Sequence, residues 1–270
     1  MNLPKILILI PVWKRPEITE ICFSGLDRIR KHRANIEILA VISENEYKAR
    51  CDTHEIEYTF FENQPLGAKK NHGLKVALDK DWDYLIELNS DDLIKNELLD
   101  IYDTLNHDYL ALRNFCFLDS KTLRLKEVES KTAYGIGRRY SRRAVESCKV
   151  KTMHMKETCI TSEGVLERGK VYDVKQENIY GNVISEGIKM WNDAASAGMD
   201  NFSNLLLNSR GYFAKQIFCK EPLAVDIKSD VNIWAFNENA GIDYDLDKFK
   251  NGLPELDGII NSYKTTVLSC

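Results

Sequence analysis

The chain has 270 residues and a mass of 31.1 kDa, which suits one large domain or two small ones. Its net charge of −4 excludes binding of nucleic acid through overall positive charge, although a local patch could still bind. The apolar run near the N-terminus is far shorter than the roughly 18 residues of a membrane-spanning helix. The seven cysteines and five histidines lack zinc-ligand spacing. We therefore expect a cytoplasmic protein with reduced thiols, no zinc and no membrane partner.

The first 120 residues alternate between strand-like and helical segments. Apolar runs at 6–12 and 36–43 predict buried strands, and 17–32 has apolar residues at helical spacing with basic residues at its end. This alternation predicts βαβ units and a mostly parallel central sheet flanked by helices. The other elements expected here are strands at 56–63, 84–88 and 109–115, and a helix within 65–78.

Beyond residue 120 the pattern is less regular. We expect a solvated strand at 121–128, which could form a hairpin, and a strand turning into a short helix within 132–148. A helical region is expected at 188–211, and a late strand with a loop at 222–236. Residues 150–185 are polar and indicate loops and short strands. Because no repeat or linker interrupts the chain, we expect a single domain.

Polar clusters follow three of the predicted strands. In open parallel sheets ligands bind just beyond the carboxyl ends of the strands, so this shared placement points to a binding site. The adjacent carboxylates of Asp91 and Asp92 could chelate a hard divalent cation. The alternative is that Ser90 or Asp91 caps a helix, because helix N-termini favour acids. The clusters are Trp13-Lys14-Arg15, Ser43-Glu44-Asn45 and Asn89-Ser90-Asp91-Asp92.

Three motifs in chain order resemble the family 2 nucleotide-sugar glycosyltransferases, which have the GT-A fold. Pro11-Val12-Trp13-Lys14-Arg15 resembles the family's Pro-x-Tyr-Asn-Arg-like turn, with Lys14 where Asn is usual. Asn63 to Gly67 and Lys70 to Leu74 resemble its Asn-x-Gly and Arg-Asn-x-Gly segments, with Lys70 in place of Arg. Asn89 to Asp92 resembles the Asp-x-Asp or Asp-Asp signature, but its first acid is Asn. The resemblance is good over residues 5–95 and faint beyond.

The resemblance implies an α/β fold of the GT-A type. Residues 1–120 would bind the nucleotide sugar, and residues 121–270 would form the acceptor-binding and catalytic half of the same domain. Asp92 would bind Mn²⁺ or Mg²⁺, and Asp91 would bind the ribose or the metal. Further residues expected to bind the nucleotide sugar are Pro11, Trp13, Arg15, Glu44, Lys70, Asn71, Arg139 and Lys228.

Several of these residues have simpler interpretations. Trp13 could be a rim aromatic, Glu44 a solvated loop residue, and Lys228 a surface lysine. Lys69 and Lys70 could form an exposed helical face. The arginines at 138, 139, 142 and 143 could hold phosphates of the donor or of a polyanion such as DNA, with a solvated basic face as the alternative.

Inverting glycosyl transfer needs a carboxylate that takes the proton of the acceptor hydroxyl. Family members carry this acid well past the metal motif, at the start of a helix. Asp200 is our candidate, because it follows Gly198-Met199 and could begin a helix facing the cleft. The alternative is that Asp200 is only a helix cap. Asp193 and Glu163 are rival candidates for the base.

The expected function is a metal-dependent, inverting glycosyltransferase that uses a nucleotide-diphosphate sugar, with a UDP-sugar as the expected donor. The acceptor is open, and hydroxymethylated phage DNA is one candidate. A nucleotidyltransferase is an alternative, although 12–19 lacks the Gly-rich loop typical of that class. A non-catalytic nucleotide-binding module is a second alternative, which Lys14 and Asn89 keep open.

Overall fold

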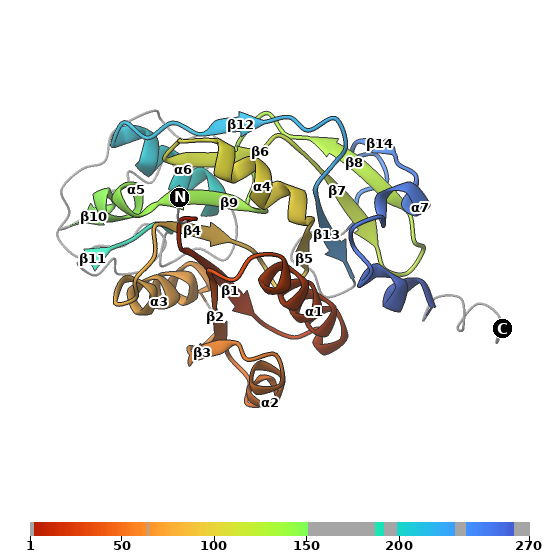
Figure 1. The fold of residues 1–270 in the computed structure, drawn as a ribbon, viewed down its shortest axis with the longest axis horizontal. Coiled ribbons are helices and arrows are strands. Elements are labelled where there is room, and N and C mark those ends of the chain that lie inside the picture. The colour runs from red at the N-terminus through yellow and green to blue at the C-terminus, as the bar shows by residue number, and fades with distance from the viewer. Residues whose placement is uncertain (1–2, 64, 151–186, 192–198, 230–235, 262–270) are drawn as a thin grey trace.

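A computed structural model describes residues 3–63, 65–150, 187–191, 199–229 and 236–261. At its centre lies a seven-stranded sheet. Its strands are β1 (Ile6–Val12), β2 (Ile36–Ile42), β3 (Glu57–Phe60), β4 (Tyr84–Glu87), β6 (Tyr109–Leu112), β9 (Arg138–Ser141) and β12 (Lys215–Ile217). They lie in the order β12-β6-β9-β4-β1-β2-β3 (Figure 1). Strand β9 is antiparallel to β4 and β6, and the other neighbours are parallel. The expected α/β class and mostly parallel sheet are confirmed.

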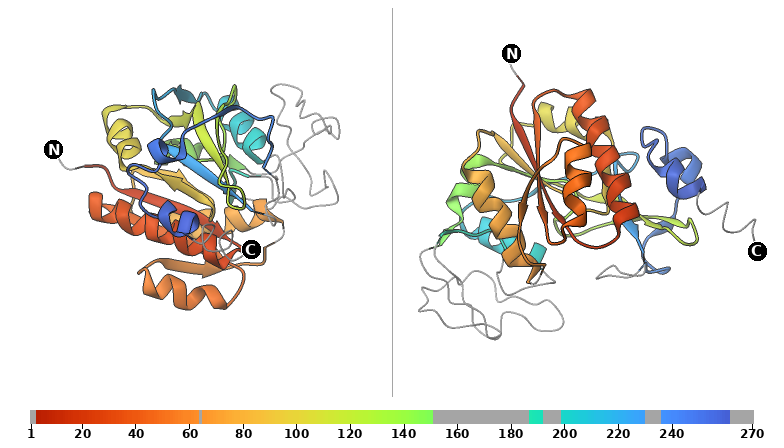
Figure 2. Two further views of the ribbon diagram at one scale, coloured as in Figure 1. Left: turned by 90° about the vertical axis from the view of Figure 1, so that its right-hand side faces the viewer. Right: turned by 90° about the horizontal axis from the view of Figure 1, so that it is seen from below.

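Helices cover both faces of this sheet. The helices are α1 (Pro16–His32), α2 (Glu46–Thr53), α3 (Leu66–Leu78), α4 (Asn96–Thr104), α5 (Arg142–Ser147) and α6 (Met199–Ser209). One face packs against α1, α2 and α4, and the other against α3, α5 and α6. Figure 2 shows α1 and α2 side by side, with α3 across the sheet. Within the described residues, no helix has both the length and the hydropathy to cross a membrane.

Strand β1 shows why both faces are covered. Side chains alternate along a strand, so Ile8 and Ile10 join the core beneath α1, while Leu7 and Leu9 join the core beneath α3. A strand buried on both faces is apolar at every position. That is the reason why 6–12 reads as a continuous apolar run.

A second, mainly antiparallel sheet lies beside the first and was not expected. Its strands are β5 (Asp92–Ile94), β7 (Asn114–Asp119), β8 (Leu125–Glu129), β13 (Ala224–Lys228) and β14 (Ile242–Asp243), in the order β14-β8-β7-β13-β5. Strands β7 and β8 form the hairpin anticipated around 121–128. The short helix α7 (Leu246–Phe249) contributes Phe249 to the core of this sheet. A separate two-stranded pair joins β10 (Lys149–Val150) to β11 (Gly187–Ile188).

Two expected elements differ from the structure. The strand expected at 109–115 is divided between the two sheets, as β6 and β7, with the exposed Arg113 at the crossing. The helical region expected from residue 188 begins at Met199 within the described residues, because residues 187–188 pair as β11. Local periodicity does not encode either change, because each depends on a partner strand distant in the chain.

Gly73 lets α3 approach the sheet closely. A Cβ at this position would lie 2.4 Å from Cγ2 of Val41 and 2.7 Å from Cδ1 of Leu9. Glycine lowers helix propensity, but here its lack of a side chain permits the contact. One turn earlier the same face of α3 carries the buried Lys69 and Lys70. The glycine therefore helps to set the depth at which these two lysines lie.

We expect Gly73→Ala to destabilise the fold by about 1–3 kcal/mol, because the added methyl group overpacks the contact with Leu9 and Val41. Urea unfolding measures this change. Gly258→Ala is the matched control, because no atom lies within 4 Å of a Cβ there and the residue is helical. The control should be neutral or stabilising by up to about 1 kcal/mol. Equal stability of the two variants would contradict the close-approach argument.

Candidate functional site

Polar side chains gather at one edge of the central sheet. Strands β4, β1 and β2 are parallel neighbours, so their carboxyl ends lie together. Trp13 follows β1, Glu44 follows β2, and Asn89 to Asp92 follow β4. The placement expected from the sequence is confirmed.

Three buried carboxylates meet at this edge. Asp92 begins β5, which runs antiparallel to β13, and Asp226 of β13 is the residue directly opposite Asp92. One oxygen from each of Asp91, Asp92 and Asp226 lies within 4.8 Å of the others. Because Asp92 starts a strand rather than a helix, the helix-cap interpretation of Ser90 and Asp91 is wrong.

Asn89 holds Asp92 in place. The backbone N–H of Asn89 donates to Oδ2 of Asp92 at 2.7 Å, and its side-chain Nδ2 donates to the same oxygen at 3.0 Å. Oδ1 of Asp92 is buried and accepts no hydrogen bond from the described residues. An acid at position 89 would place a second negative charge against Oδ2. The departure from Asp at the first position of the motif therefore suits the geometry of Asp92.

Two cations oppose the three carboxylates. Nη1 of Arg15 lies 2.5 Å from Oδ2 of Asp91, and Nζ of Lys228 lies 2.6 Å from Oδ2 of Asp226. Arg15 has a φ of 57°, a left-handed conformation at the start of α1. Such a conformation is rare for a residue with a side chain and is often found at functional sites.

Burial and mutual repulsion perturb these acids. Burial, with Asp226 and Asp91 nearby, raises the pKa of Asp92 well above its usual value. Burial and the nearby Asp91 raise the pKa of Asp226 to about 7, against the opposing effect of Lys228. Oδ1 of Asp226, like Oδ1 of Asp92, is buried without a hydrogen-bond partner among the described residues.

The three carboxylates fit a hard divalent cation. Mg²⁺ and Mn²⁺ prefer oxygen ligands, and ligands on opposite sides of Mg²⁺ are about 4.2 Å apart. The three oxygens lie within 4.8 Å of one another, and two buried oxygens of the cluster have no hydrogen-bond partner among the described residues. The donor set is that of a Mg²⁺ or Mn²⁺ site rather than a zinc site.

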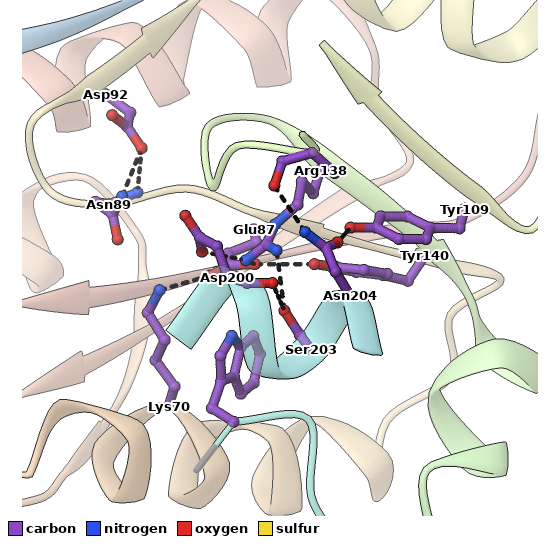
Figure 3. Close-up of polar contacts among 12 residues, drawn as sticks. Lys70, Glu87, Asn89, Asp92, Tyr109, Arg138, Tyr140, Asp200, Ser203 and Asn204 are labelled. Atoms are coloured by element: carbon purple, nitrogen blue, oxygen red, sulfur yellow. Dashed lines mark hydrogen bonds and ion pairs between the residues drawn. The ribbon is translucent and has the colours of Figure 1, made fainter. Parts of the chain in front are cut away.

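A second charged centre is formed around Glu87 of β4, which is 1% exposed (Figure 3). Its two oxygens accept from Nζ of Lys70 at 2.5 Å and from Nη2 of Arg138 at 2.6 Å. Burial alone would raise the pKa of Glu87, but Arg138 and Lys70 hold it below its usual value. Nη2 of Arg138 also donates to Oδ1 of Asp200 at 2.7 Å. Arg138 thus joins a fully buried carboxylate to a partly exposed one.

Asp200 lies in the first turn of α6 with a side chain that is 33% exposed. Its Oδ1 accepts from Arg138, whereas Oδ2 accepts no hydrogen bond from the described residues. A Cβ at Gly135 would lie 3.1 Å from each of the two oxygens of Asp200. The Asp200 carboxylate is therefore fixed on one side and packed against a glycine on another.

The two adjacent lysines of α3 are buried, so their interpretation as an exposed helical face is wrong. Lys69 donates to the carbonyl of Val12 at 2.5 Å, to Oγ of Ser43 at 2.5 Å and to Oδ1 of Asn63 at 3.2 Å. These acceptors follow or end three neighbouring strands. Burial lowers the pKa of Lys69 to about 7. Lys70, in contrast, is directed at Glu87.

Four other predicted residues line or support the edge. Trp13 is half-buried, with Nζ of Lys14 4.5 Å from its ring centroid, and Pro11 is buried within β1. Glu44 is half-buried, and burial raises its pKa. Asn71 holds a distant segment, because its Nδ2 donates to the carbonyl of Trp191 at 2.5 Å.

The prediction that Arg139 binds the donor is wrong. Its guanidinium donates to the carbonyls of Tyr102, Leu105 and His107 at the end of α4. Arg138 and Arg139 are neighbours on β9, and neighbouring strand residues point to opposite faces of the sheet. Only Arg138 therefore reaches Asp200.

The four arginines do not form a basic patch. The Arg138 and Arg139 side chains are fully buried on opposite faces. Arg142 donates to the carbonyls of Lys80 and Leu78, and Arg143 pairs with Asp108.

Sequence reasoning missed Glu87 and Asp226. Glu87 ends the apolar strand β4 and Asp226 lies between apolar residues of β13, and a buried charge needs a partner or a metal. That pattern was the available signal. The rival bases Asp193 and Glu163 lie outside the described residues.

Comparison with known proteins finds no matching family model and no matching curated protein. Among solved structures, S. aureus TarS 1-349 in complex with UDP-GlcNAc is similar, with a TM-score of 0.49 and 10% identity over 84% of this chain and 60% of that one. The mannosyltransferase PcManGT from Pyrobaculum calidifontis, in complex with GDP-Man and Mn²⁺, has a TM-score of 0.40 and 12% identity over 54% and 46%.

A third similar structure is glucosyl-3-phosphoglycerate synthase from Mycobacterium tuberculosis in complex with Mn²⁺, UDP and phosphoglyceric acid. Its TM-score is 0.38, with 10% identity over 55% of this chain and 59% of that one. These neighbours are GT-A-type glycosyltransferases, as the sequence resemblance led us to expect. The chain spans about 60% or less of their lengths. Their TM-scores lie below 0.5, so an activity must be argued from the site itself.

We expect Asp92→Asn to stabilise the fold at about pH 8 by on the order of 1–3 kcal/mol, because it removes a buried charge beside Asp91 and Asp226. The folded-state pKa of Asp92 is raised, so Asp92 lowers the free energy of unfolding of the wild type. This loss grows as the pH rises above about 4 and through the raised pKa. The gain should therefore be smaller at about pH 4.5.

Urea unfolding at the two pH values without divalent ions measures this effect. The exposed Asp52 of α2 supplies the control, Asp52→Asn, which should change stability by less than about 0.5 kcal/mol. An Asp92→Asn variant no more stable than the wild type at the higher pH would contradict the predicted repulsion.

Proposed function

We propose that the protein is a metal-dependent glycosyltransferase that moves a sugar from a nucleotide-diphosphate sugar to an acceptor hydroxyl, with inversion. The observation that carries this proposal is the pair of unlike carboxylate centres. Asp91, Asp92 and Asp226 form a cluster in which Oδ1 of Asp92 and Oδ1 of Asp226 are buried without a hydrogen-bond partner among the described residues. Asp200 is a single, partly exposed carboxylate with one oxygen fixed. The first suits a cation, and the second suits a base.

Asp91, Asp92 and Asp226 would hold Mn²⁺ or Mg²⁺. Such an ion, when bound beside the donor, offsets the negative charge of the diphosphate leaving group. Arg15 and Lys228 already lie against two of these acids and would present their remaining donors to the phosphates. Both cations thus have a role that the sequence resemblance also implied.

The nucleoside would lie along the ends of β1 and β2. Trp13 offers an aromatic surface there, and Glu44 offers a carboxylate with one buried oxygen, Oε2, that has no hydrogen-bond partner among the described residues. An aromatic face suits a base, and a carboxylate accepts from base or ribose donors. Lys69 ties these strand ends together from below.

Asp200 would take the proton of the acceptor hydroxyl. Arg138 fixes Oδ1, which leaves Oδ2 to accept from the acceptor. Arg138 is in turn held by Glu87, so it acts as a positioning residue for Asp200.

The four clustered arginines do not support a DNA acceptor. That suggestion depended in part on a basic patch of four arginines, two of which are fully buried and the other two occupied by carbonyl or carboxylate partners. We therefore propose an acceptor hydroxyl without assigning it to nucleic acid.

The test is metal-dependent release of nucleoside diphosphate. With Mn²⁺ and UDP-glucose, UDP-N-acetylglucosamine or GDP-mannose, the wild type should slowly hydrolyse at least one donor. Asp92→Ala should lower the rate about 100-fold or more through loss of the cation site. Asp200→Asn should lower it by about 10²–10⁴-fold through loss of the base, with donor affinity retained.

Asp52→Asn is again the control and should leave the rate unchanged. Failure to release nucleoside diphosphate from any of the three donors would contradict the proposal. Release of pyrophosphate from a nucleoside triphosphate would instead favour a nucleotidyltransferase. Donor affinity without release would favour a binding module.

We also expect Gly135→Ala to lower the hydrolysis rate about 10–100-fold, because the new methyl group displaces the Asp200 carboxylate from its place on Arg138. Thermal stability should change little, since Gly135 does not have a positive φ. Gly258→Ala controls for the substitution itself. An unchanged rate in Gly135→Ala would show that the position of Asp200 does not limit turnover.

A further inference from the structure

Tyr134 is close to both carboxylate centres. Its ring stacks on Phe115 with centroids 4.7 Å apart and meets the ring of Phe117 edge-on at 6.0 Å. Nζ of Lys228, the partner of Asp226, lies 4.7 Å from the centroid of Phe117. The Tyr134 ring is therefore linked, through Phe117 and Lys228, to the three-carboxylate cluster.

The residue that follows Tyr134 in the chain contacts Asp200. Gly135, the next residue in the chain, is the glycine that packs against both oxygens of Asp200. The electrostatics agree with this position. After burial, the carboxylates of Asp226, Asp200, Asp92 and Asp91 each raise the pKa of the Tyr134 phenol. The Tyr134 phenol therefore interacts electrostatically with all four carboxylates of the two centres.

The Tyr134 hydroxyl makes no hydrogen bond to the described residues, although the side chain is half-buried on an aromatic platform. Tyrosine hydroxyls in such positions usually find a partner. The raised pKa keeps this phenol neutral, so it can donate a proton to a hydrogen bond at all ordinary pH values. A ring held by Phe115 and Phe117 presents that donor in a fixed direction.

We propose that Tyr134 is a specificity-determining residue whose hydroxyl hydrogen-bonds a hydroxyl group of the transferred sugar. This assignment depends on the proposed function. The anomeric carbon is joined to the diphosphate and is attacked by the acceptor, so the sugar must lie between the cation cluster and the base. A neutral donor beside an aromatic ring suits a sugar, whereas phosphates are matched by cations such as Arg15 and Lys228.

The test compares each sugar nucleotide with its own nucleoside diphosphate. Isothermal titration with Mn²⁺ would use UDP-N-acetylglucosamine and UDP-glucose against UDP, and GDP-mannose against GDP. Tyr134→Phe should weaken binding of the preferred sugar nucleotide about 10-fold and change binding of its nucleoside diphosphate by less than about 2-fold. Tyr84→Phe is the matched control, because it removes a phenol hydroxyl at the amino end of β4, away from the carboxyl edge. It should change neither the affinity for the sugar nucleotide nor that for the nucleoside diphosphate.

A series of deoxy-sugar donors then identifies the partner. The 10-fold loss should disappear for the analogue that lacks the sugar hydroxyl bound by Tyr134, as in a double-mutant cycle. An unchanged sugar-nucleotide affinity in Tyr134→Phe would overturn the assignment, as would an equal loss for the nucleoside diphosphate. If the wild type bound none of these ligands, the proposed function would fail first, and the assignment with it.

Discussion

The antiparallel pairing of β5 with β13 sets Asp92 directly opposite Asp226, and the rest of the site depends on that register. Two buried acids on facing strands repel each other, and Asp91 adds a third charge. A fold gains no stability from such an arrangement alone. The cost of holding it is therefore a physical reason to regard the cluster as a cation site.

The surroundings reduce this cost without removing it. Asn89 supplies two N–H donors to a single oxygen of Asp92, while Arg15 and Lys228 pair with the other two acids. The pKa of Asp92 nevertheless stays well above its usual value. The two cations neutralise only part of the negative charge of the three acids. The remaining negative charge favours binding of a divalent ion, and the two cations favour the phosphates that such an ion would accompany.

A buried ion network connects the sheet to the proposed base. Glu87 is buried, yet it stays ionised because Arg138 and Lys70 both bind it. Arg138 then carries the network out to Asp200 on α6. Residues from β4, α3, β9 and α6 thus meet in one set of contacts, and the position of the base follows from the packing of these elements.

Much of the fold was predictable because local patterns encode it. Continuous apolar runs marked β1 and β2 as strands buried on both faces, and polar clusters marked the shared carboxyl edge where Asp91 and Asp92 lie. Those features depend on residues close together in the chain. The second sheet was missed because its pairing joins strands more than a hundred residues apart.

The residue pattern alone indicated the α/β class, the polar carboxyl edge of the sheet and two of the three clustered acids. The packing of strands distant in the chain brings Asp226 into the cluster and connects Glu87 to Asp200 through Arg138. The close spacing of the four arginines suggested that they act together. In the structure, Arg138 and Arg139 point to opposite faces of the sheet and have different partners. The physical reason is that periodicity shows which residues are buried, whereas strand order and sheet face decide which of them meet.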